Sequence, residues 1–257
     1  MVKLLELFSG THSIGKVAHQ LDIEVVSLDR DLPDYDKSDK EKKYKSDKHI
    51  QCCLLDWNYK KDYKPGDFDI ITASPSCYYW SHLRKCWFNA YFNKETRKFS
   101  RTKKEGFVLF NQKELDEDID KFGKPQVDRI IEILEYFKPK WWWIENPKSS
   151  SMKYYLLEKG YNHPKIISYC KYGFQYQKHT SFWTNIPLEP KLCKNDCENM
   201  VVIGESKLHI TNCGNTERIN KVKKHLKNIG GIGGGTNRLE RYRIPPKLIE
   251  ELLKLCI

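Results

Sequence analysis

The chain has 257 residues, which suits one globular domain or one domain with a small added lobe, and its hydrophobic content of 39% is enough for a core, so general disorder is excluded. Its 45 lysine and arginine residues outnumber 34 acidic residues and give a formal net charge of +11, which favours a polyanionic partner such as nucleic acid. Without a membrane-length apolar run or a signal-peptide core, we expect an intracellular protein, in cytoplasm or nucleus, with no membrane partner.

Strands, turns and a helix alternate in the first part of the chain. Residues 3–8, KLLELF, predict a buried strand that ends in a glycine turn, and residues 16–21, KVAHQL, have helical spacing. Residues 24–29, EVVSLD, predict the second strand. Residues 49–57, HIQCCLLDW, predict a third strand that ends in Asp56 and Trp57.

The alternation continues through the middle of the chain. Residues 67–74, DFDIITAS, predict a fourth strand, and residues 127–137, VDRIIEILEYF, have the spacing of an amphipathic helix. Residues 138–147, KPKWWWIENP, predict a fifth strand. This order predicts an α/β fold: a doubly wound, mostly parallel sheet with helices on both faces and ligands outside the carboxyl ends of its strands.

Chemically capable residues stand at four of these strand ends: Asp29, Asp56, Cys77 and Glu145. A single acidic residue at a strand end often caps the following helix, which would be a purely structural role. Four such residues at one edge of a parallel sheet favour a functional site instead.

Seven segments resemble, in order, the motifs of the cytosine-5 DNA methyltransferases, most closely the short forms of phages and large DNA viruses. They are LELFSGTHSIGKVA, VVSLDRD, LLDWNY, DIITASPSC, WWWIENP, YCKYGFQYQKHTSFWTN and RYRIPPKLIEEL. The match covers roughly residues 1–83, 125–190 and 236–257. The glycine turn is weak evidence alone, whereas a proline turn with cysteine on one strand end and Glu-Asn on the next is far more specific.

The resemblance implies a covalent mechanism at cytosine. Carbon 5 becomes nucleophilic enough to accept a methyl group only after a nucleophile adds to carbon 6, and a thiolate suits that reversible attack. Cys77 is the expected nucleophile, and Glu145 is the expected acid against ring nitrogen 3. Where the family has a Gln-x-Arg-x-Arg pattern, this chain has Tyr176, Lys178 and Thr180. Of these three residues only Lys178 carries a positive charge, which is expected near the ring oxygen.

The resemblance also implies S-adenosyl-L-methionine as the cofactor and methyl donor. Asp29, with Arg30 beside it, is expected at the ribose; Asp56 and Trp57 are expected at the adenine; and backbone amides of residues 8–15 are expected at the amino-acid end. The full set of expected cofactor residues is Phe8, Ser9, Gly10, Thr11, His12, Ser13, Ile14, Asp29, Arg30, Asp56, Trp57 and Pro75.

Three features depart from the family pattern. His12 stands where the second glycine of the first turn is expected, and it fits if its backbone need not adopt positive φ. Ser76 stands where proline normally precedes the cysteine, so the turn keeps a small residue but loses stiffness. Two of the three polar positions near Lys178 are also changed.

Residues 84–105 are a candidate loop for holding open the gap left by a flipped base. Eight basic residues against two acidic ones give this segment a charge of +6, and aromatic residues lie between them. The expected nucleic-acid contacts are Arg84, Lys85, Arg97, Lys98 and Arg101. The alternative is a solvated basic insert whose aromatic rings pack on the sheet.

Residues 186–235 are expected to form a small target-recognition insert, and residues 1–185 with 236–257 the catalytic domain. The insert carries Cys193, Cys197, His209 and Cys213, at C-x3-C and H-x3-C spacings that could close around zinc. The spacing is irregular and the chain holds nine cysteines, so we assign no metal ligand from the sequence. The glycine-rich run at residues 228–238 is interpreted as a hinge.

The sequence therefore predicts a monomeric DNA cytosine-5 methyltransferase with duplex DNA as its partner. Two other hypotheses stay open: an RNA methyltransferase, because a member of the same family modifies tRNA, and a non-catalytic nucleic-acid-binding relic. Amino-group methyltransferases fit less well, because they stack the base on an aromatic residue behind a proline pair, whereas SPSCYY places a cysteine there.

Overall fold

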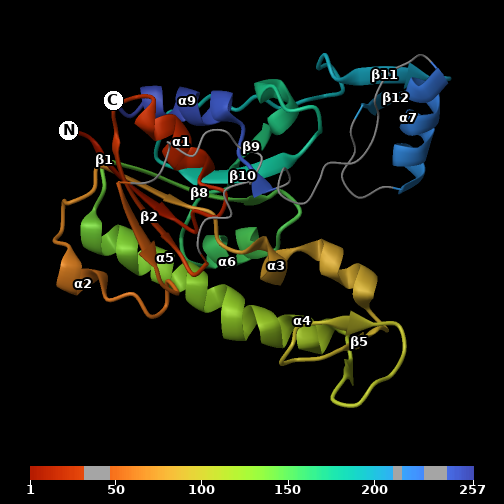
Figure 1. The fold of residues 1–257 in the computed structure, drawn as a ribbon, viewed down its shortest axis with the longest axis horizontal. Coiled ribbons are helices and arrows are strands. Elements are labelled where there is room, and N and C mark those ends of the chain that lie inside the picture. The colour runs from red at the N-terminus through yellow and green to blue at the C-terminus, as the bar shows by residue number, and fades with distance from the viewer. Residues whose placement is uncertain (32–46, 211–215, 229–241) are drawn as a thin grey trace.

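The computed structural model describes residues 1–31, 47–210, 216–228 and 242–257, and a seven-stranded sheet forms its centre (Figure 1). The strand order is β3-β2-β1-β4-β8-β10-β9. The strands are β1 (Lys3–Leu7), β2 (Glu24–Asp29), β3 (Lys48–Gln51), β4 (Ile70–Ala73), β8 (Trp141–Pro147), β9 (Lys165–Ser168) and β10 (His179–Thr184). The first five strands in this order are parallel to one another, and β10 is antiparallel to both β8 and β9. The predicted mostly parallel α/β sheet is confirmed.

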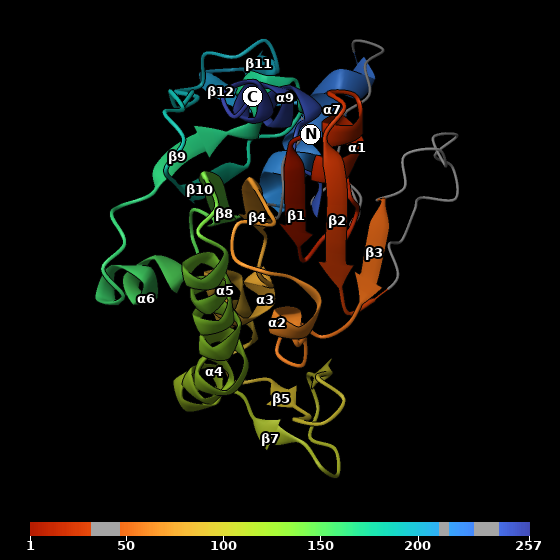
Figure 2. The ribbon, with the colours of Figure 1, turned by 90° about the vertical axis from the view of Figure 1, so that its left-hand side faces the viewer.

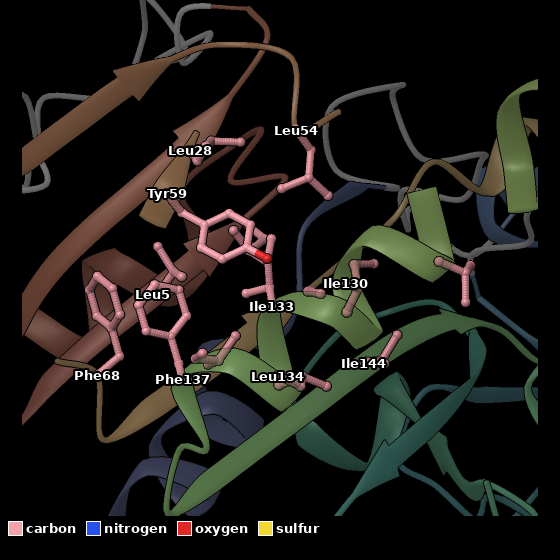
Figure 3. Close-up of a cluster of buried hydrophobic side chains, with 14 of the residues drawn as sticks. Leu5, Leu28, Leu54, Tyr59, Phe68, Ile130, Ile133, Leu134, Phe137 and Ile144 are labelled. Carbon is pink, nitrogen blue, oxygen red and sulfur yellow. The ribbon is translucent and has the colours of Figure 1, made fainter. Parts of the chain in front are cut away.

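Helices cover both faces of this sheet because the central strands are apolar on both sides. Leu5 of β1 points into a cluster with α5 (Lys124–Phe137) and α6 (Met152–Glu158), which Figure 3 shows in part. Its neighbour Leu4 points into a second cluster with α1 (Ser13–His19) and α9 (Pro246–Lys254). Successive strand residues therefore contact opposite helical layers. Figure 2 shows the ribbons of α1 and α9 apart from those of α5 and α6.

The third strand differs from its prediction. β3 ends at Gln51, and the chain then turns through residues 52–58 into the short helix α2 (Tyr59–Asp62). The last bond toward β2 is from the amide of Cys52 to the carbonyl of Asp29, at 3.0 Å. Asp56 therefore lies in an exposed turn rather than at a strand end.

A small lobe begins at Cys77 and lies below the central sheet in Figures 1 and 2. It contains α3 (Cys77–Trp80), the 3-10 helix η1 (His82–Trp87), and a three-stranded sheet in the order β6-β5-β7. These strands are β5 (Tyr91–Phe92), β6 (Phe99–Ser100) and β7 (Val108–Leu109), followed by α4 (Gln112–Asp118) and the π-helical turn η2 (Ile119–Gly123). The lobe has its own core of Phe92, Phe110 and Leu115.

The described part of the predicted recognition insert contains two strands and a helix. Strands β11 (Met200–Ile203) and β12 (Ser206–His209) pair as an antiparallel hairpin, and α7 (Thr216–Asn228) lies against it. The 3-10 helix η3 (Tyr169–Tyr172) connects β9 toward β10 beside this region. Among the described residues, no helix is long and apolar enough to cross a membrane.

Candidate active site

Cys77 and Glu145 come together because β4 and β8 are parallel neighbours. The register pairs Ala73 with Ile144, so the residues after these positions leave the sheet at the same edge. Cys77 begins α3 three residues beyond Ser74, and Glu145 remains inside β8, opposite Phe182 of β10. Cys77 and Glu145 therefore both lie at the carboxyl edge of the sheet, where the Glu145 charge acts on the pKa of the Cys77 thiol.

Glu145 is a buried carboxyl group with spare hydrogen-bonding capacity. Its side chain is 8% exposed, and its Oε2 atom has no hydrogen-bond partner among the described residues. Burial raises the pKa of Glu145, against the opposing effects of the Lys178 charge and a hydrogen bond with Ser74. A buried carboxyl group with a raised pKa and an unused oxygen is suited to holding a proton and donating it to a ligand.

Cys77 is half-buried beside this carboxyl group. Burial raises the pKa of its thiol, the Glu145 charge raises it further, and the Lys178 charge lowers it. Lys178 is half-buried, with its Nζ 4.7 Å from the centre of the Tyr169 ring. The structure therefore places the three predicted catalytic residues within one electrostatic environment.

The turn before Cys77 keeps the conformation of a proline turn. Ser76 has φ −53° and ψ 110°, and a φ of this value is within the range that proline imposes. The Asn146 side chain donates to the Pro75 carbonyl at 3.0 Å, which ties the turn to β8. Serine in place of proline at position 76 therefore makes the turn less stiff but does not change its shape.

The first turn has an unusual backbone. Phe8, Gly10 and His12 have φ values of 59°, 46° and 54°, all in the left-handed region. The condition under which His12 was considered to fit, a backbone without positive φ, is not met. His12 is fully buried, and its Nδ1 lies 2.6 Å from Glu6 Oε2, a contact that offsets the cost of the left-handed backbone.

Glu6 organises the turn from inside β1. Its two carboxylate oxygens also accept the amides of Ile14 and Gly15 at 3.2 and 3.3 Å. These two amides were expected at the amino-acid end of the cofactor, so the structure corrects that part of the prediction. Ser9 offers a different polar group, because its buried Oγ has no partner within the described part of the chain.

Asp29 ends β2 at the same edge and is half-buried. Its Oδ2 accepts the Gly10 amide at 2.9 Å, and its Oδ1 accepts the Asp31 amide at 3.1 Å. Each oxygen keeps a lone pair, so the carboxylate can still accept ribose hydroxyl groups. With the unpartnered Ser9 hydroxyl, this donor and acceptor set fits S-adenosyl-L-methionine.

The other predicted cofactor residues are arranged differently. Arg30 is exposed and pairs with Asp31 at 3.3 Å. Trp57 packs in the core, 5.6 Å from the Tyr59 ring, and is only 3% exposed. Of the pair expected at the adenine, Asp56 alone presents its side chain at the surface.

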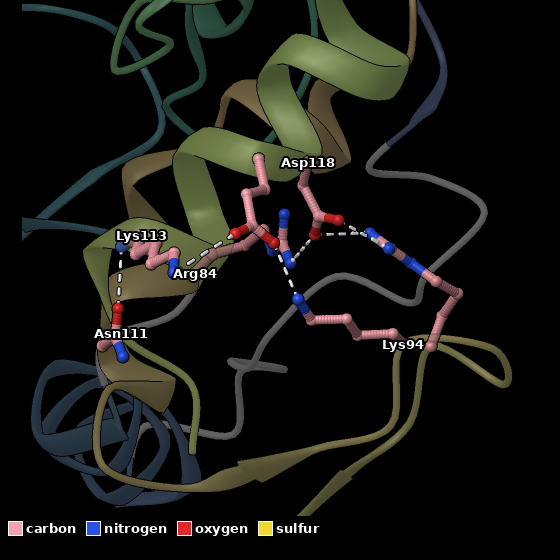
Figure 4. Close-up of polar contacts among 7 residues, drawn as sticks. Arg84, Lys94, Asn111, Lys113 and Asp118 are labelled. Atoms are coloured by element: carbon pink, nitrogen blue, oxygen red, sulfur yellow. Dashed lines mark hydrogen bonds and ion pairs between the residues drawn. The ribbon is translucent and has the colours of Figure 1, made fainter. Parts of the chain in front are cut away.

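Asp118 at the end of α4, which the sequence analysis missed, binds two arginine residues of the lobe after Cys77 (Figure 4). Arg84 Nη2 lies 2.6 Å from Asp118 Oδ2, and Arg97 binds both oxygens of the same carboxylate at 2.7 and 2.6 Å. Arg84 is 4% exposed, so it is not accessible for a phosphate contact in this structure. Lys85, Lys98 and Arg101 are exposed.

The aromatic residues of this lobe pack mainly on one another. Phe92 and Phe99 rings lie 4.7 Å apart, and the Trp87 and Phe99 rings stack at 4.9 Å. Arg101 lies over the Trp87 ring at 4.8 Å. The lobe is therefore a packed unit with exposed cations rather than an open base-stacking loop.

Of the changed positions near Lys178, Tyr176 and Thr180 are both buried. Of the residues considered for zinc, Cys193, Cys197 and His209 lie together, and Cys213 lies outside the described residues. Cys170, which the sequence spacing does not indicate, joins the same group.

No protein-family model matches the sequence. A curated protein of Frog virus 3 (isolate Goorha), named "Probable DNA (cytosine-5)-methyltransferase", is 33% identical over 261 residues, covering 99% of this chain and 100% of that protein. The chain belongs to the cytosine-5 DNA methyltransferase family. Family membership makes it a methyltransferase and agrees with its Rossmann-like sheet.

Three solved structures are also similar to this methyltransferase. A mutant of Spodoptera frugiperda DNMT2 has a TM-score of 0.43 at 14% identity, with coverage of 74% of this chain and 53% of that one. S. pombe Dnmt2 methyltransferase scores 0.39 at 14% identity, covering 76% and 52%. Entamoeba histolytica methyltransferase EhMeth scores 0.45 at 16% identity, covering 78% and 58%. The chain thus spans a little over half the length of each.

Proposed function

We propose that this protein methylates carbon 5 of cytosine in duplex DNA, with S-adenosyl-L-methionine as methyl donor and Cys77 as a covalent nucleophile. The observation that carries the proposal is the pairing of Cys77 with Glu145, whose buried Oε2 has no partner among the described residues. A structural role for Glu145 would leave that oxygen uncompensated, at a cost of about 1–3 kcal/mol.

The proposed reaction begins with attack of Cys77 on the cytosine ring. The Cys77 thiolate forms a bond to carbon 6, and the electron pair of the ring double bond is displaced toward nitrogen 3 and the ring oxygen. Protonated Glu145 donates its proton to nitrogen 3, and the Lys178 ammonium stabilises the developing charge on the oxygen. When bound, S-adenosyl-L-methionine would supply an electrophilic methyl group to carbon 5, and the bond from that methyl group to sulfur would break so that S-adenosyl-L-homocysteine leaves.

The product forms by elimination. A base, for which water suffices, removes the proton on carbon 5, and the electron pair re-forms the ring double bond as the bond between carbon 6 and Cys77 breaks. Glu145 regains its proton from nitrogen 3, so the thiolate and the carboxylic acid are both restored. Asp29 and the Ser9 hydroxyl bind the donor and orient it during these steps.

The proposal is tested with the purified full chain and tritium-labelled donor on matched substrates: duplex DNA, the same single strand, and tRNA. We expect label in DNA cytosines, confirmed by bisulfite sequencing. A Cys77→Ala variant should bind the donor normally, transfer no methyl group, and form no adduct with DNA containing 5-fluorocytosine, which traps the wild type.

Each other result selects a different function. Preferential labelling of tRNA would replace DNA by RNA as the substrate while keeping the mechanism. Donor binding without transfer to any substrate, or an adduct that persists in Cys77→Ala, would contradict the assignment of Cys77. Failure to bind the donor would indicate a non-catalytic nucleic-acid-binding protein.

A further inference from the structure

We propose that Cys170, Cys193, Cys197 and His209 form a zinc site that fastens the predicted recognition insert to the catalytic sheet. One ligand atom from each of these residues lies within 4.8 Å of the other three. They come from three separate segments: η3, the loop after β10, and β12. None of the four residues has a role in the proposed methyl transfer.

The distances agree with a tetrahedral metal. His209 Nε2 lies 3.7 Å from Cys193 Sγ and 3.2 Å from Cys197 Sγ. With Zn–S bonds of about 2.3 Å and a Zn–N bond of about 2.0 Å, tetrahedral geometry requires nitrogen and sulfur ligands to be roughly 3.5 Å apart. The two measured distances lie on either side of that value, so these two pairs already have the spacing that a bound ion requires.

The chain bends between the two neighbouring cysteines of this group. Asn195 has φ 64°, a left-handed conformation between Cys193 and Cys197. Both sulfur atoms lie near the same imidazole nitrogen, His209 Nε2.

The ligand types select zinc. Three thiolates and one imidazole form a common structural zinc set, and four protein ligands leave no open position for catalysis. Cys170, Cys193 and His209 are each at most 5% exposed. Such a closed and buried site has a structural role.

The site would add to the polar contacts that hold this region together. Near it, Lys171 pairs with Asp196 at 2.8 Å and the Asn199 side chain donates to the Phe174 carbonyl at 3.0 Å. The hairpin β11–β12 buries only part of its apolar surface, because Val202 is 63% exposed and the other residues of β11 are half-buried. A metal that is bound by Cys170 on one side and His209 on the other would fix the position of the hairpin relative to η3.

The first test measures metal in the full-length protein. Protein expressed in zinc-supplemented medium and purified under reducing conditions should contain one zinc per chain by plasma mass spectrometry. Replacement by cobalt(II) should give the intense visible absorption of a tetrahedral thiolate site. Both readouts are independent of methyl transfer, so they stand even if the proposed function fails.

Variants identify the ligands. Cys170→Ser, Cys197→Ser and His209→Ala should each lower the zinc content and alter the cobalt spectrum. Cys86→Ser is the matched control, because Cys86 is an exposed cysteine outside the group, and it should retain one zinc. Cys213→Ser should also retain zinc, which distinguishes Cys170 from the fourth ligand that the sequence spacing indicates.

Three results would overturn the proposal. Wild-type protein that contains no zinc and takes up neither zinc nor cobalt under reducing conditions has no such site. A mass deficit of two hydrogens that maps to Cys193 and Cys197 would replace the metal by a disulfide. Loss of zinc from Cys213→Ser with retention in Cys170→Ser would contradict the ligand set.

Discussion

The imidazole of His12 occupies the space next to Gly15, so that a Cβ on Gly15 would lie 1.9 Å from His12 Cε1. The same imidazole contacts Glu6 at 2.6 Å, while Glu6 accepts the Gly15 amide. The residue that departs from the family pattern is therefore one part of a three-residue arrangement, in which histidine at one position requires glycine at the other.

This arrangement predicts that the effect of Gly15→Ala on stability depends on which residue stands at position 12. Gly15→Ala should lower the free energy of unfolding by about 1–3 kcal/mol because of the overlap with His12. In a His12→Gly background, the same change should cost nothing or should stabilise by up to about 1 kcal/mol, since alanine is the better helix former. Urea unfolding of the four proteins measures the coupling, and an equal cost in both backgrounds would contradict it.

A second prediction concerns the pH dependence of methyl transfer. The Lys178 charge lowers the pKa of Cys77 and of Glu145, although burial raises both. Lys178→Met should therefore raise both pKa values. In the pH profile of kcat/KM, the rise that requires the Cys77 thiolate should move to higher pH. The fall that requires protonated Glu145 should move in the same direction.

Activity at neutral pH should then fall, by roughly 100-fold if Lys178 also stabilises the ring oxygen. The control is Lys64→Met, an exposed lysine in the turn before β4, at the opposite edge of the sheet. A profile for Lys178→Met that keeps its limbs at the wild-type pH would show that the Lys178 charge does not act on this pair.

Regular local patterns made much of the fold and catalytic pair predictable. β2 has the bounds that its apolar run indicates, and Cys77 and Glu145 meet because parallel neighbours end at one edge. Residues 52–57 were wrongly extended into the third strand because Leu54 and Trp57 are buried in the core while the backbone turns. An apolar run reports burial and does not by itself distinguish a strand from a packed turn.

Long-range polar contacts were the part that the sequence could not supply. Asp118 lies in an acidic helical run and binds Arg84, which is 34 positions away. Cys170 joins His209 through the folding of the insert, so no local spacing indicates it. Glu6 is different, because a charged residue within the buried run LLEL could have indicated a partner inside the protein.

A third prediction concerns Asp29 and the donor. Asp29→Ala should weaken binding of S-adenosyl-L-methionine by roughly 2 kcal/mol, a typical loss for charged hydrogen bonds. It should also destabilise the protein by about 1 kcal/mol, because the Gly10 amide loses its acceptor. Calorimetric titration measures the first effect, with exposed Asp31→Ala as control. Unchanged affinity would place the ribose contact elsewhere.

A fourth prediction concerns the lobe after Cys77. Asp118→Ala would leave buried Arg84 without a counter-charge, so the free energy of unfolding should fall by about 3–5 kcal/mol. Asp116→Ala removes an exposed carboxylate from the same helix and should change stability by no more than about 0.5 kcal/mol. Similar stability of the two variants would mean that the Asp118 ion pairs are not needed to hold the lobe.

The final prediction concerns Lys85, Lys98 and Arg101, the exposed cations of the same lobe. Each phosphate contact releases condensed counterions from duplex DNA, so replacing all three by alanine should weaken binding and reduce the slope of affinity against salt concentration by about 2.7 logarithmic units. Arg84 and Arg97 stay in place, so the Asp118 ion pairs and the fold are preserved.

The matched control replaces Lys61, Lys64 and Lys140, which are also exposed. Lys64 and Lys140 precede β4 and β8, at the edge of the sheet opposite Cys77. This variant loses the same three charges, so a general effect of net charge would weaken DNA binding equally in both. If the lobe binds phosphate, the control should retain most of the wild-type salt slope. Equal slopes for the two variants would show that the lobe makes no specific contacts and that the basic surplus acts through the whole surface.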